Sequence, residues 1–263
     1  MIALVETLPL TVLLMLLECA VGGMLILLMT DLEGNVSRGF LVTSGLILAV
    51  AAGLTYLLRF GYGDAAGALA PTLAILTLLL VGYSVLAMLD RRRIARVVGV
   101  AAVLVGCWTL FQSVVLQTLQ VSMHDAAGLF SLALATLVAG AALTALLLGH
   151  WYLVTPLLSA QSLRRVTEVL LIGIGLQVLW LLGQILGFDG AHAAASIASY
   201  GFVFWFRVVV GLAFPLILGV LTWRSCKIRA MQTATGLLYI ALGCVLAGDA
   251  AAKVFSFLTS VSL

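Results

Sequence analysis

The chain has 263 residues, of which 64% are hydrophobic and only 9% charged, and its mean hydropathy is +1.27. Soluble globular domains are about 45–50% apolar and about 25% charged, so this composition excludes a soluble fold. It predicts an all-α integral membrane protein, with residues 1–263 forming a single domain surrounded by lipid bilayer. The net charge of +3 is too small and too scattered to indicate a nucleic-acid partner.

Continuous apolar runs of about 20 residues, the length that crosses a bilayer, define eight predicted helices. They cover residues 7–30, 39–59, 70–89, 97–118, 127–149, 167–187, 199–222 and 231–257. Because the runs are apolar throughout rather than alternating, they favour helices over membrane strands. The first run is too long for the core of a signal peptide and no basic segment precedes it, so we expect it to be the first span.

Basic residues gather in the odd-numbered connections between these helices. They are Arg38, Arg91, Arg92, Arg93, Arg96, Arg164, Arg165, Arg224, Lys227 and Arg229. The positive-inside rule places such connections in the cytoplasm, which predicts a multi-pass protein of the cell (inner) membrane with both termini outside. The turns between helices three and four and between helices seven and eight are the most basic. A parallel four-plus-four duplication, giving two four-helix bundles, would produce this topology.

Three charged residues lie within the predicted spans: Glu18, Arg207 and Asp249. Each would cost about 2.5–3.5 kcal/mol if it stood alone at the centre of the bilayer, which makes such residues functional candidates. Arg207 and Asp249 lie at similar depths on consecutive antiparallel helices, so the sequence predicts that they pair, with Lys253 one turn further along. The alternative is a buried ion pair that serves helix packing alone.

Glu18 lies near the centre of the first predicted helix, and the sequence offers no obvious partner for it. An isolated carboxyl group in a low-dielectric environment favours its neutral form. Two interpretations stay open: Glu18 relays protons, or it is a neutral acid hydrogen-bonded to a neighbouring helix.

Glutamines mark two further helix faces. Gln177 and Gln184 share one face of the sixth helix with Trp180, and Gln112 lies on the fourth. Because a glutamine facing lipid is costly, these side chains are expected to point inward. Their neutral donors and acceptors suit a carbonyl-bearing amphiphile such as a quinone, while hydrogen bonding between helices is the alternative.

The histidines lie outside the predicted spans, which argues against the paired ligands of a membrane haem. His124 and His192 fall in connections on the outer side, and His150 falls at the inner boundary beside Trp151 and Tyr152, two residues typical of an interfacial aromatic belt. The four cysteines show no metal-binding or haem-attachment spacing. The sequence therefore predicts no metal site and no covalently bound cofactor.

Three segments resemble a known family. "FWFRVVVGLAFPLILGVL" with "LLYIALGCVLAGDAAAK", and the glycine-rich "LECAVGGMLILLMTD", are similar to helices of the NrfD/PsrC-like membrane anchors of bacterial redox complexes. The resemblance covers about a third of the chain. It implies two four-helix bundles, a quinone bound near the outer face, and electron exchange with an iron–sulfur subunit outside the membrane. Arg207, Asp249 and Gln184 would lie near the quinone, and Glu18 on a proton path.

Three functions follow as hypotheses. The leading one is a quinone-interacting, non-haem subunit of a respiratory or redox complex, which is not catalytic alone and needs partner subunits carrying iron–sulfur or haem centres. A small secondary transporter or channel would instead use Glu18, Arg207 and Asp249 as coupling groups. Transport is disfavoured because no predicted span is clearly broken by glycine or proline, apart from Pro215 in the seventh. The third is a structural or assembly subunit of a larger membrane complex.

Overall fold

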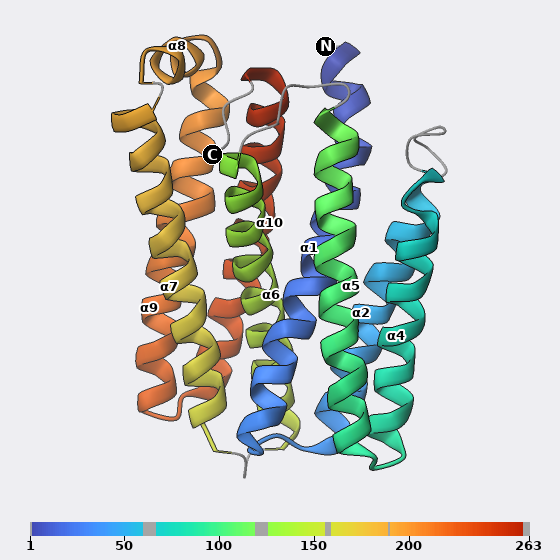
Figure 1. The fold of residues 1–263 in the computed structure, drawn as a ribbon. Coiled ribbons are helices and arrows are strands. Elements are labelled where there is room, and N and C mark those ends of the chain that lie inside the picture. The colour runs from blue at the N-terminus through green and yellow to red at the C-terminus, as the bar shows by residue number, and fades with distance from the viewer. Residues whose placement is uncertain (1, 60–66, 119–125, 156–158, 189, 260–263) are drawn as a thin grey trace.

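The computed structural model describes residues 2–59, 67–118, 126–155, 159–188 and 190–259. Within these ranges, eight helical segments are long and apolar enough to cross a membrane. They confirm the predicted all-α, polytopic membrane fold, and each corresponds to one of the predicted spans. Figure 1 shows them as a bundle of roughly parallel and antiparallel helices.

The helices divide into two sets of four that follow one another along the chain. The first set contains α1 (Ile2–Glu33), α2 (Arg38–Leu58), α4 (Ala70–Met88) and α5 (Arg92–Thr118). The second contains α6 (Ala126–Val154), α7 (Gln161–Gly183) with η2 (Gln184–Phe188), α8 (Gly190–Phe206) with η3 (Arg207–Ala213) and α9 (Phe214–Lys227), and α10 (Met231–Thr259). Within each set, consecutive helices pack on one another and the last returns to the first. Each set is therefore a four-helix bundle.

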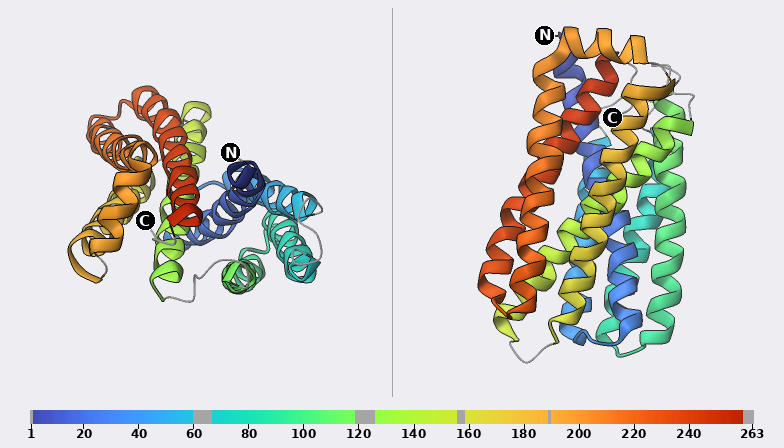
Figure 2. Two further views of the ribbon diagram at one scale, coloured as in Figure 1. Left: turned by 90° about the horizontal axis from the view of Figure 1, so that it is seen from above. Right: turned by 90° about the vertical axis from the view of Figure 1, so that its left-hand side faces the viewer.

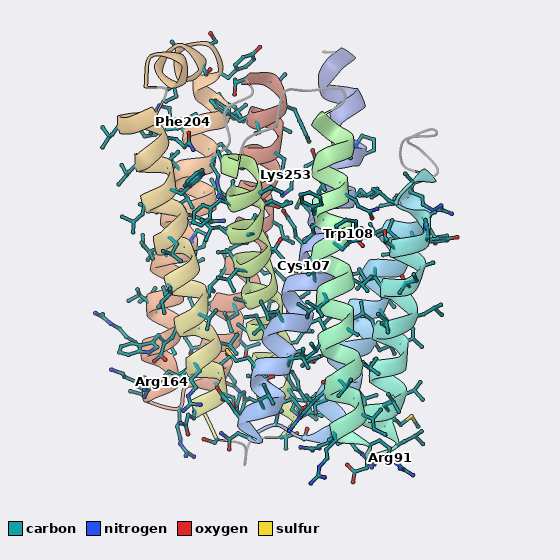
Figure 3. All side chains as sticks on the ribbon, in the orientation of Figure 1. Arg91, Cys107, Trp108, Arg164, Phe204 and Lys253 are labelled. Carbon is teal, nitrogen blue, oxygen red and sulfur yellow. The ribbon has the colours of Figure 1, made fainter. Side chains whose placement is uncertain are left out.

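The two ends of the molecule differ. At one end, here called the terminal end, α1 begins and α10 ends (Figure 1). The first part of α8 lies across this end (Figure 2). The backbone of Tyr200 is not helical (φ −124°, ψ 35°), and from there the chain continues along the direction of the other spans. The opposite end, here called the basic end, carries the arginine-rich connections, with Arg91 and Arg164 labelled in Figure 3.

Matching turns at the basic end support an internal repeat. The link from α4 to α5 and the link from α9 to α10 each place a non-glycine residue in the left-handed region: Asp90 (φ 60°) and Arg229 (φ 56°). In each turn the residue after it donates a backbone hydrogen bond of 2.9 Å to a carbonyl five positions back. This is the Schellman arrangement that ends helices. The same device thus joins the third and fourth spans of both bundles.

The first helix of each bundle forms the centre of the molecule. In the most apolar window of α1 and of α6, 72% of the residues are buried, against 28–44% for the other six spans. The two helices cross where Gly22 meets Gly140: a Cβ added to Gly22 would lie 1.9 Å from the Thr136 carbonyl oxygen, and one added to Gly140 would lie 2.0 Å from the Gly22 carbonyl carbon. Only glycine permits this close backbone approach.

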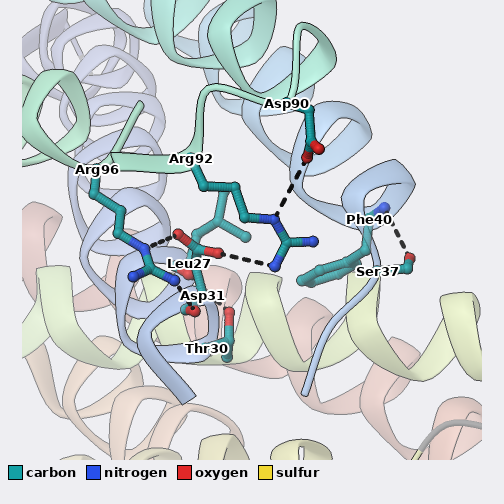
Figure 4. A network of polar contacts seen from close by, with 8 residues as sticks. All are labelled: Leu27, Thr30, Asp31, Ser37, Phe40, Asp90, Arg92 and Arg96. Carbon is teal, nitrogen blue, oxygen red and sulfur yellow. Dashed lines mark hydrogen bonds and ion pairs between the residues drawn. The ribbon is translucent and has the colours of Figure 1, made fainter. Parts of the chain in front are cut away.

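Ion pairs at the basic end hold the first bundle together and tie it to the second. Asp31 of α1 is buried, and it accepts a hydrogen bond from Arg96 Nε on α5 at 2.7 Å, while Arg96 Nη2 donates to the Asp31 carbonyl at 2.8 Å (Figure 4). Two residues further along α1, Glu33 pairs with Arg165 of α7 at 2.9 Å. The arginines predicted to set the orientation therefore also fix helix packing.

Candidate functional site

Four charged residues from three elements meet between the two bundles, within the spans. Glu18 lies on α1, Arg207 is the first residue of η3, and Asp249 and Lys253 lie one turn apart on α10. We call these four residues the charge cluster. Glu18, Arg207 and Asp249 are at most 4% exposed, and the Lys253 side chain is 10% exposed. The cluster is thus enclosed by protein rather than by lipid.

Lys253 is the centre of the cluster. Its Nζ donates to Glu18 Oε2 at 2.7 Å and to Asp249 Oδ2 at 2.6 Å. One ammonium group therefore holds a carboxylate from each bundle. Such charge-assisted hydrogen bonds are short and about twice as strong as neutral ones. The second carboxyl oxygen of Glu18, Oε1, is buried and has no hydrogen-bond partner among the described residues.

Arg207 lies beside this pair of acids without a direct ion pair to either. It is within electrostatic range of both Asp249 and Glu18, and its Nε is buried without a hydrogen-bond partner in the described part of the chain. Its side chain packs along Gly211, which lies so close to Gly248 of α10 that a Cβ on Gly211 would be 2.5 Å from the Gly248 Cα. This second glycine contact brings η3 against the helix that carries Asp249.

The π-helical segment η3, which begins at Arg207, has a local cause in the sequence. Pro215 lacks an N–H group and its ring would collide with the carbonyl four residues earlier in a regular helix. Just before it, the Phe214 N–H bonds to the Val209 carbonyl, five residues back, as in a π-helix. Such π-helical segments are rare and occur often at functional sites. The irregularity expected at Pro215 thus extends back along the span, because Arg207–Ala213 is π-helical.

Every member of the cluster lies in the half of its own span nearer the terminal end, where Figure 3 labels Lys253. At 1.5 Å per residue, Lys253 lies about 9 Å and Asp249 about 15 Å from Thr259, the last described residue of their span. Glu18 lies about 14 Å from Pro9, where its own span begins. With two acids and two bases, the cluster is neutral overall when every group is ionised, and it can change charge only by moving a proton.

The predicted pairing was partly wrong. Asp249 makes its direct ion pair with Lys253 rather than with Arg207, and Glu18, for which the sequence offers no obvious partner, is held by the same lysine. Lys253 was missed as a central residue, although its spacing of four from Asp249 was a usable signal.

The glutamines lie away from these direct contacts. Gln177 is buried as predicted, and its Oε1 has no hydrogen-bond partner among the described residues. Trp180 Nε1 also has no hydrogen-bond partner there. The Trp180 ring packs on Phe130 of α6, with 4.8 Å between the ring centroids. Gln184 is half-buried at the start of η2. Gln112 is half-buried in the first bundle and accepts a hydrogen bond from the Thr72 hydroxyl at 3.1 Å. The structure therefore does not bring the glutamines into one site.

Of the three histidines, His150 is the one whose side chain the structure describes. His150, at the basic end of α6, lies 3.5 Å from the Tyr239 hydroxyl through its Nδ1. His124 and the side chain of His192 lie outside the described residues. Beside His150, Tyr152 is buried and donates to the Ser159 carbonyl, and Trp151 packs on Phe40. These two aromatic residues thus pack within the protein instead of forming the expected belt toward lipid.

In the described ranges, no group of three or more histidine, cysteine, aspartate or glutamate side chains is placed to hold a metal ion. The arrangement at the charge cluster suits proton exchange instead. It combines two buried carboxyl groups, a shared ammonium and an arginine that can stabilise negative charge on a bound group. Comparison of the chain with protein families, curated proteins and solved structures finds no match.

Proposed function

We propose that this protein is the membrane-embedded subunit of a respiratory or redox complex, in which a quinone or quinol exchanges protons with the charge cluster. The observation that carries the proposal is Glu18: a fully buried carboxyl, held on one oxygen by Lys253 at 2.7 Å, with its other oxygen unpartnered among the described residues. Quinone reduction requires two protons for two electrons, so its site needs a group able to deliver protons within the membrane.

The division into two four-helix bundles agrees with what the NrfD/PsrC-like resemblance implies. By the positive-inside rule the basic end faces the cytoplasm of a bacterial inner membrane, so the charge cluster lies toward the outside. Partner subunits carrying iron–sulfur or haem centres would dock at the terminal end and exchange electrons with the quinone. This chain would supply the binding site and the proton path, and would not catalyse the reaction alone.

The first experiment is purification in mild detergent through a tag on this subunit, followed by protein mass spectrometry, metal analysis and quinone extraction. We expect redox subunits and quinone to co-purify. A lone protein without quinone would refute the proposal.

A matched pair of variants then tests the site in the purified complex. Glu18→Gln keeps the size and the hydrogen-bonding capacity of the side chain but carries no proton to exchange. It should lower quinone turnover about 10²- to 10⁴-fold, the usual contribution of a general acid or base, while leaving assembly intact. Asp90→Asn, on a carboxyl group that is 69% exposed at the basic end, should leave turnover unchanged. Lost assembly with normal turnover per assembled complex would indicate a purely structural subunit.

One observation favours transport as a second candidate function. The π-helical segment η3 interrupts a span at the depth of Arg207, and interrupted helices at the interface between repeats form the binding sites of many secondary transporters. Proton uptake into vesicles containing the purified protein alone would test this candidate. Transport that is abolished in Glu18→Gln would replace the redox proposal.

A further inference from the structure

Hydroxyl side chains follow the charge cluster along α10 toward the terminal end. Ser256 lies three residues beyond Lys253, Thr259 lies three residues beyond Ser256, and both are buried (5% and 8% exposed). Asp249, Lys253 and Ser256 are spaced four and three residues apart, so they share one face of the helix. At 1.5 Å per residue, Ser256 lies about 4.5 Å along the axis from Lys253. Polar groups therefore continue along α10 from the cluster to the last described residue of the span.

The Ser256 hydroxyl is not committed to a hydrogen bond with any described residue. Its Oγ is buried without a partner in that part of the chain, whereas the Thr259 hydroxyl donates to the Phe255 carbonyl at 2.8 Å. A side chain in a helix covers the turn before it, so the Ser256 hydroxyl lies over the turn that holds Lys253. Because a hydroxyl group can donate and accept hydrogen bonds at the same time, Ser256 is suited to pass a proton between Lys253 and the terminal end.

The two helices that carry the acids are apolar on the other side of the cluster, toward the basic end. On α10 the buried residues between Thr235 and Asp249 are leucine, alanine, valine and glycine. On α1 every residue between Glu18 and Thr30 lacks a charged, hydroxyl or amide side chain. These stretches are about 21 and 18 Å long at 1.5 Å per residue. At this depth α6 supplies the Thr144 hydroxyl, which already donates to a carbonyl of α1 at 3.4 Å. A proton from the basic end would therefore meet few groups able to bind it.

The ionisable side chains near Glu18 belong to the elements that carry the cluster. They include Lys253 and Asp249 of α10, Arg207 of η3 and Cys19, the neighbour of Glu18 on α1. The remaining helices that pack on α1 carry, in their described parts, acidic and basic side chains only near the basic end. Arg59, which caps α2 at the terminal end, lies 3.9 Å above the Tyr56 ring instead. Lys253 donates a hydrogen bond to Glu18, and it is also the member of the cluster closest to Ser256 along α10.

We propose that Ser256 relays protons between the charge cluster and the water at the terminal end, and that the cluster exchanges none with the basic end. During uptake, Lys253 gives a proton to Glu18 Oε2, the Ser256 hydroxyl replaces it with its own, and Ser256 takes one from the terminal side. One proton has then moved from water to Glu18, while Lys253 and Ser256 are restored. Release follows the same steps in reverse. That the proton serves a quinone rests on the proposed function, but the relay and its side do not.

The test follows Glu18 in sealed phosphatidylcholine vesicles that hold at most one full-length protein each. An affinity tag placed after α10 separates vesicles with the terminal end outward, which a resin captures, from those with it inward. The external pH is stepped over the range in which the protein stays folded, and time-resolved infrared spectroscopy follows the carboxyl band that Glu18→Gln lacks. This band should respond at once in the captured vesicles, and in the others only as fast as a trapped pH dye reports leakage. A prompt response in the second set, or no response in either, would overturn the proposal.

Variants at Ser256 test the relay itself. Ser256→Ala removes the hydroxyl and should slow the response of the Glu18 band at least several-fold, whereas Ser256→Thr keeps a hydroxyl and should respond at the wild-type rate. The control is Ser84→Ala: Ser84 is also 5% exposed, and its hydroxyl donates to the Leu80 carbonyl in the first bundle at 3.0 Å. This variant should respond like the wild type. An unchanged rate in Ser256→Ala, or equal slowing in Ser84→Ala, would contradict the relay.

Quinone turnover by the purified complex separates the relay from the proposed function. Turnover that is slowed in Ser256→Ala and normal in Ser256→Thr supports both. Turnover that depends on Glu18, in a protein whose Glu18 band responds to the pH at the basic end, retains the function and refutes the relay. Conversely, a protein without quinone turnover whose Glu18 band still responds through Ser256 keeps the relay and loses the proposed function.

Discussion

Replacing Lys253 with methionine removes the ammonium group that joins the two bundles while keeping a side chain of similar length. In the structure this group contacts two carboxylates, at 2.7 and 2.6 Å, and the three side chains are 10%, 0% and 6% exposed. Removing one partner from a buried ion pair costs about 3–5 kcal/mol, because the remaining charge is left without compensation. We therefore expect Lys253→Met to lower the free energy of unfolding by about 3–5 kcal/mol.

The chain has one other lysine, Lys227, which provides the control. Its Nζ lies 3.5 Å above the Trp223 ring near the basic end, and such a contact at an exposed site stabilises by about 0.5–1 kcal/mol. Lys227→Met should therefore have a small effect when unfolding is followed by circular dichroism during titration of detergent-solubilised protein with dodecyl sulfate. Equal losses in the two lysine variants would refute the central role of Lys253.

A double variant tests whether the stability lost in Lys253→Met is lost because two buried carboxylates no longer have a cation. Adding Glu18→Gln to Lys253→Met removes one of the two uncompensated carboxylates. The double variant should therefore be more stable than the sum of the single effects predicts, by about 0.5–3 kcal/mol, the range found for residues in contact. Strict additivity would mean that Glu18 and Lys253 do not interact in the folded protein.

Two further substitutions test the packing between helices. Gly22→Leu should block the close approach of α1 to α6, so that size-exclusion chromatography no longer shows a folded, monodisperse protein. The control is Gly243→Leu, at a position where an added Cβ meets open space, and this variant should elute like the wild type. Asp31→Asn should lower the free energy of unfolding by about 1.5–3 kcal/mol, because the hydrogen bond from Arg96 loses its charged acceptor. The control, Asp90→Asn, affects only a 4.0 Å ion pair at the surface. It should change the free energy of unfolding by less than about 0.5 kcal/mol.

The spans could be predicted from the sequence because each is set by local composition. A continuous apolar run has one low-energy arrangement in a bilayer, a helix in which the backbone N–H and C=O groups bond to one another. The two most basic turns, singled out in the sequence, also prove to be matching Schellman turns around Asp90 and Arg229. In both cases the signal lies within a few neighbouring residues.

The composition of the charge cluster could be predicted only in part. Glu18, Arg207 and Asp249 stand out because charges are rare within spans. The contact of Glu18 with Lys253 joins residues 235 positions apart, and it depends on how the two bundles pack. That packing is set by the glycine crossing of α1 and α6, where small residues permit a close approach without indicating the partner helix.

The shared lysine also has a consequence for how the protein is made. Asp249 and its cation lie four residues apart and enter the membrane together, whereas Glu18 is synthesised with the first span and its cation with the last. At about 5–20 residues per second, the ribosome needs roughly 10–50 s to reach Lys253, which lies 235 positions after Glu18. Throughout this interval the nascent first helix carries an acid without its cation. The ion pair of α1 thus forms only once α10 has been made.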